Sequence, residues 1–104
     1  MSTETTSDYR RSRRAAVELP VTLLRSQGNP ITSRTVEVGI GGMRVCCDRP
    51  LSIDELLSFE IDAAGERVGG RARVLREHVS RTYALRFERL EPQASEALRR
   101  LAGA

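Results

Sequence analysis

Residues 31–47 have the sequence ITSRTVEVGIGGMRVCC, in which two strand-like runs flank a glycine-rich corner. The first run, 31–38, is rich in β-branched residues, which favour strands. The second run, 43–47, places Met43, Val45 and Cys47 on one side, because successive strand side chains point to opposite faces. Between them lies Gly39-Ile40-Gly41-Gly42. We therefore expect two consecutive strands that meet at this corner.

The same alternation of apolar and polar residues extends to both sides of this stretch. An earlier half-buried strand is expected around Val17–Leu23, with a bend or an edge position at Pro20, which lacks an N–H. Later strands are predicted at 57–62, 66–76 and 82–87, and the apolar residues expected to point inward include Leu57, Phe59, Ile61, Tyr83 and Phe87. The Gly69-Gly70 pair in the longest of these strands is typical of a bulge or a barrel corner.

The chain then ends in a predicted helix over residues 92–102. Pro92 lies near its first position, where proline is tolerated, and an apolar stripe at helical spacing is formed by Ala94, Ala97, Leu98 and Leu101. Six short antiparallel strands followed by one helix indicate an all-β fold, a small barrel or closed sandwich with a C-terminal α-helix.

Length and composition fit one small domain. A chain of 104 residues is long enough for one core. Residues 1–8 are predicted to be a disordered tail and residues 9–104 a single domain, which opens with a basic arm at 9–14. No apolar run approaches a membrane span, and the polar N-terminus is unlike a signal peptide. Cys46 and Cys47 are adjacent, so their side chains should point to opposite faces and form no structural disulfide, which indicates a reducing cytoplasm.

The net charge is +3, and all 17 basic residues are arginine. Four of them are concentrated in the arm, at positions 10, 11, 13 and 14. A guanidinium can donate two parallel hydrogen bonds to a phosphate or to the O6/N7 edge of guanine. The arm therefore indicates a phosphate or guanine site, and the alternative is a solvated basic tail.

The arm and the corner together resemble the PilZ domain family over residues 9–102. The family motifs are R-x-x-x-R in an N-terminal segment and D/N-x-S-x-x-G at a strand-to-strand turn. Arg10 and Arg14 match the first motif, and Gly42 matches the last position of the second. Glu37 stands where the family has Asp or Asn, and Gly39 stands where it has Ser.

The resemblance implies a six-stranded antiparallel β-barrel that binds cyclic di-GMP on its outer surface. The basic arm would fold over the ligand, and its ordering would be the signal to an unidentified protein partner. The implied ligand-binding residues are Arg10, Arg11, Arg13, Arg14, Glu37, Gly39, Gly41 and Gly42. In the family, the carboxylate or amide and the serine of the second motif bind guanine, so Glu37 is expected to keep an acceptor while Gly39 loses a hydroxyl.

Three other interpretations follow from the same residues. The departures at Glu37 and Gly39 favour a degenerate domain that binds no nucleotide and acts as a protein-interaction adaptor. The corner alone is also explained by a tight β-turn that needs positive φ. A nucleic-acid-binding barrel would need exposed stacking aromatics. Three of the four aromatics are expected in the core, which argues against nucleic acid as a ligand.

No pattern indicates an enzyme or a metal protein. His78 is the single histidine and falls in a predicted turn beside Glu77, where a solvated loop residue is expected. One histidine and two adjacent cysteines do not supply the four converging ligands of a zinc site. We therefore expect no catalytic residues, no metal and no cofactor other than the cyclic di-GMP ligand.

Overall fold

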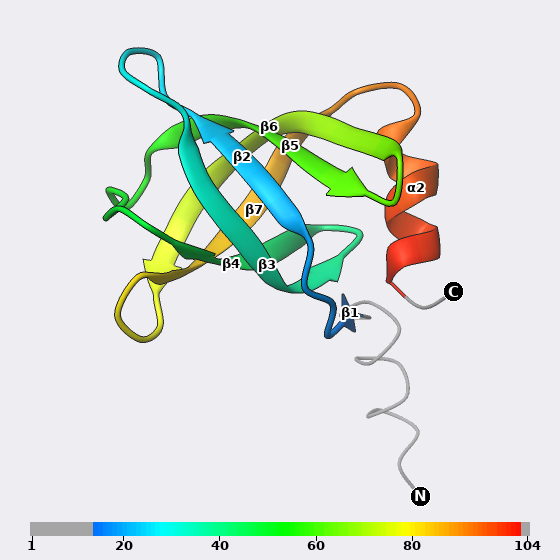
Figure 1. The fold of residues 1–104 in the computed structure, drawn as a ribbon, viewed down its shortest axis with the longest axis horizontal. Coiled ribbons are helices and arrows are strands. Elements are labelled where there is room, and N and C mark those ends of the chain that lie inside the picture. The colour runs from blue at the N-terminus through cyan, green and yellow to red at the C-terminus, as the bar shows by residue number, and fades with distance from the viewer. Residues whose placement is uncertain (1–13, 103–104) are drawn as a thin grey trace, which may run out of the picture.

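A computed structural model describes residues 14–102, and six of its strands close into an antiparallel β-barrel (Figure 1). Around the barrel the strands follow the order β3-β2-β5-β6-β7-β4, and pairing of β3 with β4 closes the ring. These strands are β2 (Pro20–Leu24), β3 (Ile31–Gly39), β4 (Gly42–Cys47), β5 (Leu56–Ala63), β6 (Glu66–Glu77) and β7 (Thr82–Leu90). The predicted six-stranded barrel is confirmed.

A seventh, two-residue strand lies outside the ring. This strand, β1 (Arg14–Ala15), pairs antiparallel with the end of β3, Arg14 with Gly39 and Ala15 with Val38. The sequence predicts Arg14 at the end of an irregular arm, but Arg14 is a strand residue. Strand β3 extends one residue beyond the predicted range 31–38, and this extra residue, Gly39, pairs with Arg14. The rest of the predicted arm, residues 9–13, and the predicted tail lie outside the described residues.

The segment between β1 and β2 is tied to the barrel by Thr35, a buried polar residue with 1% of its surface exposed. The Thr35 hydroxyl accepts a hydrogen bond from the Leu19 N–H at 2.8 Å and donates one to the Val17 carbonyl. The Thr35 N–H donates to the Leu19 carbonyl at 2.9 Å. Strand β2 therefore begins only at Pro20, later than the apolar alternation predicts, while Val17 and Leu19 pack against the core as partly buried residues.

The core is aliphatic with two aromatic rings in contact. Leu57, Phe59 and Ile61 of β5 are buried, as the alternation predicts. Tyr83 is buried as well, and its hydroxyl accepts a hydrogen bond from the Leu51 N–H at 3.0 Å. Phe87 is partly buried and stacks on Phe59 with the ring centroids 5.0 Å apart. Among residues 14–102, all three aromatic side chains are therefore buried or partly buried and form no exposed platform for stacking with bases.

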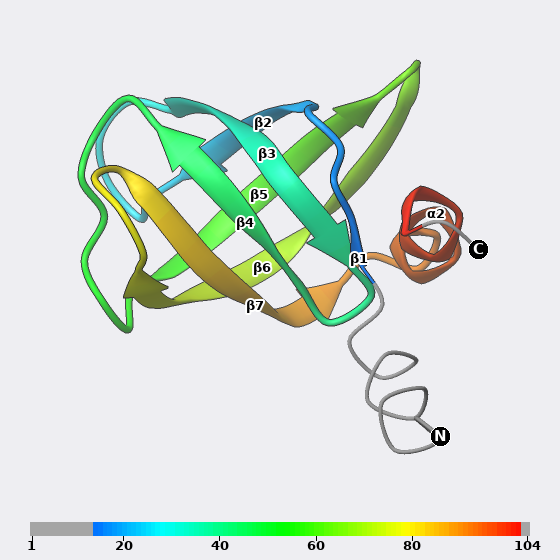
Figure 2. The ribbon, with the colours of Figure 1, turned by 90° about the horizontal axis from the view of Figure 1, so that it is seen from below.

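The C-terminal helix, α2 (Ala94–Leu101), contacts β6 and β3 and lies at the end of the barrel where β3 and β4 meet (Figures 1 and 2). Ala94, Ala97 and Leu98 are buried on its inner face, which confirms the predicted stripe. The helix begins two residues later than predicted. Just before the helix, the Glu91 N–H donates to the Gly69 carbonyl at 3.0 Å and holds the chain to β6.

The two cysteines point to opposite sides of β4, as predicted. Cys46 is exposed, Cys47 is buried, and both are free thiols. Burial raises the pKa of the Cys47 thiol to about 11, so this side chain behaves as a small apolar core residue. Within residues 14–102, no helix has the length and apolar character needed to cross a membrane.

Glycine is required at position 42 because β4 and β7 approach each other there without an intervening side chain. A Cβ atom at Gly42 would lie 2.3 Å from the Leu85 carbonyl oxygen, whereas a Cβ at Gly41 would meet nothing within 4 Å. We predict that Gly42→Ala lowers the free energy of unfolding by about 1–3 kcal/mol, the usual cost of overpacking.

Gly41→Ala is the matched control for that prediction, and its change should stay within about 0.5 kcal/mol. Urea unfolding of both variants measures the difference. Equal stabilities of the two variants would show that the barrel wall can relax around a methyl group at residue 42.

Candidate functional site

A β-bulge at Val36 determines which side chains face outward near the corner. Thr35 pairs with Val45, and the next pair is Glu37 with Arg44, so Val36 has no partner on β4. Regular alternation from Ile31 would turn Glu37 inward. The extra residue reverses the alternation, so that Glu37 lies at the surface while Val38 is fully buried. The bulge thus places a carboxylate on the outer wall of the barrel.

The Glu37 carboxylate lies between two arginines. Its Oε2 atom is 2.9 Å from Nη2 of Arg44 and 3.7 Å from Nη1 of Arg14. The three side chains are 21%, 32% and 41% exposed respectively. The group is therefore an exposed cluster with one negative and two positive charges.

Strand pairing brings the parts of the two motifs together. Arg14 is paired with Gly39 through β1 and β3, and Glu37 precedes Gly39 by two residues on the same strand. Gly41 and Gly42 follow at the turn into β4. Of the eight residues predicted to bind the ligand, these five lie at one corner of the barrel, and Arg10, Arg11 and Arg13 lie outside the described residues.

The turn itself consists of Ile40 and Gly41, between the end of β3 and the start of β4. The described residues with positive φ are Gly28, Asp54, Ala64, Gly65 and Arg81. The interpretation of the corner as a turn that needs positive φ is therefore wrong. Gly42 is explained by the close approach of β7, but Gly41 faces open space and its carbonyl accepts a hydrogen bond from the Phe87 N–H at 2.9 Å. Gly41 leaves the backbone of the corner accessible.

Arg44 was not predicted as a site residue, although it belongs to the cluster. Its partner Glu37 is seven positions away in the sequence, and only the bulged register sets the two side chains opposite each other. The available signal was position, since Arg44 lies two residues after Gly42 and therefore on the same outward face of β4. The same face continues onto β7, where Arg86 pairs with Gly42.

A second carboxylate lies between two arginines further along this face. Glu88 accepts a hydrogen bond from Nε of Arg73 at 2.7 Å and one from Nη2 of Arg86 at 2.9 Å. The Arg73 and Arg86 guanidiniums lower the pKa of the Glu88 carboxyl to about 2. Both arginines on this part of the face are thus already paired with an acid.

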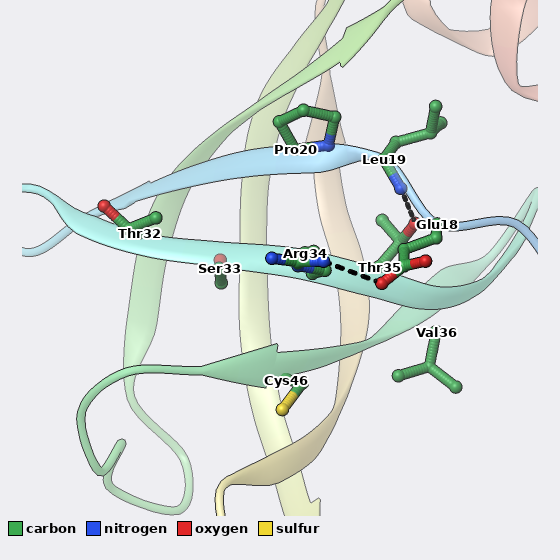
Figure 3. A pocket seen from close by; sticks show the side chains of 9 residues that line it. All are labelled: Glu18, Leu19, Pro20, Thr32, Ser33, Arg34, Thr35, Val36 and Cys46. Atoms are coloured by element: carbon green, nitrogen blue, oxygen red, sulfur yellow. Dashed lines mark hydrogen bonds and ion pairs between the residues drawn. The ribbon is translucent and has the colours of Figure 1, made fainter.

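A hollow of about 740 Å³ lies on the outer face of β2, β3 and β4, away from the corner (Figure 3). Figure 3 shows the Arg34–Glu18 ion pair in it, with N and O 2.9 Å apart, beside Pro20 and Cys46. Its one arginine is neutralised by an acid in the same hollow. The corner is the better candidate because it combines two arginines, an accessible backbone and the point where the N-terminal segment joins the barrel.

Two other ionisable residues, His78 and Glu60, lie on the surface outside the corner. His78 is exposed in the turn before β7, and Glu60 forms a 3.6 Å ion pair with Arg67 on the outer wall. Within residues 14–102 no three acidic, histidine or cysteine side chains come together in a way that could hold a metal ion.

Residues 14–102 thus form a small closed antiparallel barrel with a C-terminal helix and a charged corner bordered by glycines. The chain belongs to the PilZ domain family, whose model matches residues 8–104. Domains of this family serve as receptors for cyclic di-GMP and as adaptors that bind proteins. No curated protein matches the chain.

Two solved structures share the fold. The PilZ domain of CeSA from a cellulose-synthesizing bacterium matches with a TM-score of 0.68 and 21% identity, over 88% of this chain and 95% of that one. The Bacillus subtilis inhibitor of motility (MotI/DgrA) matches with a TM-score of 0.71 and 17% identity, over 86% of this chain. The chain spans only 47% of the length of the latter. At these identities the likeness establishes the architecture of the barrel.

The lowered pKa of Glu88 predicts how the stability of the protein depends on pH. The folded value of about 2 lies below the ordinary value of about 4.3 that an unfolded chain would show. The stability that ionised Glu88 contributes is therefore fully present above about pH 4.3 and is lost as the pH falls toward 2. NMR titration of the Glu88 carboxyl carbon should show a midpoint near 2 in the native protein and a higher one in Arg73→Gln. A midpoint near 4.3 in the native protein would contradict the ion pairs with Arg73 and Arg86.

Proposed function

We propose that this chain is a bacterial cytoplasmic receptor for cyclic di-GMP, which binds the nucleotide at the corner between β3 and β4. The observation that carries the proposal is the pairing of β1 with β3, which holds Arg14 of the first motif against Gly39 and Glu37 of the second. Family membership supports it, because the same two motifs contact the nucleotide in the family.

Each residue of the proposed site has a physical role. Arg14 is 41% exposed and can donate two hydrogen bonds to a phosphate or to guanine. Gly41 leaves the corner open to close approach of the ligand. Arg10, Arg11 and Arg13 precede Arg14 in the chain and add guanidiniums to the same ligand. The Oε2 atom of Glu37 forms ion pairs with Arg14 and Arg44. The other carboxylate oxygen, Oε1, is the acceptor that we propose for guanine N–H groups.

We further propose that the signal is a change in the segment that carries these arginines. Ordering a residue costs about 1–2 kcal/mol of backbone entropy, and a hydrogen bond to a charged group contributes about 1.5–3 kcal/mol. Several such bonds can therefore order a few residues around the nucleotide. The surface beside β1 then differs between the free and bound states, and a protein partner that reads this surface receives the signal.

The competing function is a protein-interaction adaptor without a nucleotide. Two observations favour it: Gly39 offers no hydroxyl, and the Glu37 carboxylate is already engaged by Arg14 and Arg44. In that case the corner would be a fixed surface for a protein partner. Nucleotide titration separates the two functions.

Arg14→Ala tests the receptor directly. The substitution keeps the backbone pairing of β1 but removes the guanidinium, so we expect affinity for cyclic di-GMP to fall by roughly tenfold to a hundredfold, the value of one or two charge-assisted hydrogen bonds. Isothermal titration calorimetry measures the affinity, and the molar ratio gives the number of nucleotides bound.

Arg34→Ala is the control for lost positive charge, because Arg34 is also exposed and ion-paired but lies in the hollow of Figure 3. The control should bind like the native protein. A folded native protein that gives no saturable heat with cyclic di-GMP would reject the receptor function and leave the adaptor.

Gly39→Ser restores the hydroxyl of the family motif. Gly39 has no positive φ, so serine can adopt its backbone conformation. We expect the added hydrogen bond to guanine to contribute about 1 kcal/mol and to tighten cyclic di-GMP binding roughly tenfold by calorimetry. Unchanged or weaker binding would show that guanine does not contact residue 39.

A further inference from the structure

We propose that Arg44, which lies outside both family motifs, determines how much of Arg14 is available to an anionic ligand, because it holds the Glu37 carboxylate that otherwise pairs with Arg14. The identity of the ligand rests on the proposed function, but the competition between the two arginines for Glu37 does not. Arg44 is in this sense a positioning residue for the proposed site.

The two arginines do not share Glu37 equally. Both face the same atom, Oε2, at 2.9 Å from Arg44 and 3.7 Å from Arg14. The Arg44 pair is in direct contact, whereas the Arg14 pair is 0.8 Å longer and lies near the outer limit of an ion pair. Glu37 is therefore the closer partner of Arg44 and lies only near Arg14.

Burial reinforces this asymmetry. The Arg44 side chain is 32% exposed, and its Nε atom is buried without a hydrogen-bond partner among the described residues. Because the Nε atom of Arg44 is shielded from water and unpaired, the guanidinium is less well solvated than that of Arg14, and its contact with Glu37 stabilises it more. Arg14 is more exposed and gains less from Glu37. The carboxylate accordingly stays with Arg44 when a ligand approaches Arg14.

Removal of Arg44 would change the partner of Glu37. Without the cation of Arg44 the carboxylate would move the short distance to Arg14 and form a direct ion pair with it. A phosphate would then have to displace an internal carboxylate from Arg14 before it could bind. Removal of the Glu37 charge would have the opposite effect and leave Arg14 free.

A double-mutant cycle tests this coupling with cyclic di-GMP as the probe. The variants are Arg44→Gln, Glu37→Gln and the double substitution, each measured by calorimetry. We expect Arg44→Gln to weaken binding by roughly two- to fivefold, the factor that one partly exposed ion pair contributes. Glu37→Gln should tighten binding by a similar factor, because the amide oxygen remains an acceptor for guanine N–H groups while the charge that competes for Arg14 is removed. In the double variant the effect of Arg44→Gln should disappear.

If Arg44 touched the ligand directly, Arg44→Gln would weaken binding equally with and without the Glu37 charge, and that result would overturn the proposal. Weaker binding by Glu37→Gln alone would also overturn it, since Glu37 would then act mainly as an acceptor for guanine. Glu60→Gln is the charge-matched control because Glu60 is paired with Arg67 on β5 and β6, away from the corner. Arg44→Lys keeps the positive charge and should bind like the native protein. This variant shows whether weaker binding by Arg44→Gln comes from the lost charge or from a loss of folding.

Hydrogen exchange of the Arg14 Nε–H, followed by NMR without nucleotide, separates this inference from the proposed function. Exchange should slow in Arg44→Gln, speed up in Glu37→Gln and stay unchanged in Glu60→Gln. If exchange responds in this way but no variant binds cyclic di-GMP, the proposed function fails and the control of Arg14 by Arg44 stands. If Arg14 exchanges at the same rate in Arg44→Gln and Glu37→Gln, the inference is wrong whatever the nucleotide does.

Discussion

The pairing of β3 with β4, with its one-residue bulge at Val36, is the contact on which the rest of the structure depends. This pairing joins the two ends of the sheet and so removes its exposed strand edges. The six short strands thereby form a closed barrel around one core. The same bulge turns Glu37 to the outer wall and returns Val38 to the interior. One irregular residue thus serves barrel closure and also places the carboxylate around which the two arginines gather.

Much of the barrel could be predicted because alternation reports directly on burial. The inward residues of β5 and the opposite directions of Cys46 and Cys47 follow from it. The bulge could not be predicted in this way, since Thr35, Val36 and Glu37 continue a regular strand pattern and only the register with β4 shows the extra residue. The starts of β2 and α2 were misplaced for a related reason. Hydrogen bonds from Leu19 to Thr35 and from Glu91 to Gly69 lie at those boundaries, and their partners are distant in sequence.

The candidate site shows the same division between local motifs and distant contacts. Motif spacing was sufficient to select Arg14, Glu37 and Gly42, because these positions lie within or beside one strand-to-strand turn. Motif spacing did not explain why each position is glycine, whereas the structure does so for Gly42. A side chain at residue 42 would clash with the barrel wall, while a side chain at residue 41 would point into open space. Spacing from Gly42 places Arg44 on the outward face of β4, but it does not show that Glu37 faces Arg44 across β3 and β4.

The close approach of β4 to β7 at Gly42 also bears on how binding energy is distributed. Because backbone lies against backbone there, the wall of the barrel at Gly42 has no room for a side chain of its own. A ligand that lands on the corner meets a surface whose shape is already set, so the wall itself loses little conformational entropy on binding. The entropy cost then falls almost wholly on the N-terminal side of the site, and the sequence of that segment becomes the place where evolution or an engineer can adjust affinity without disturbing the barrel.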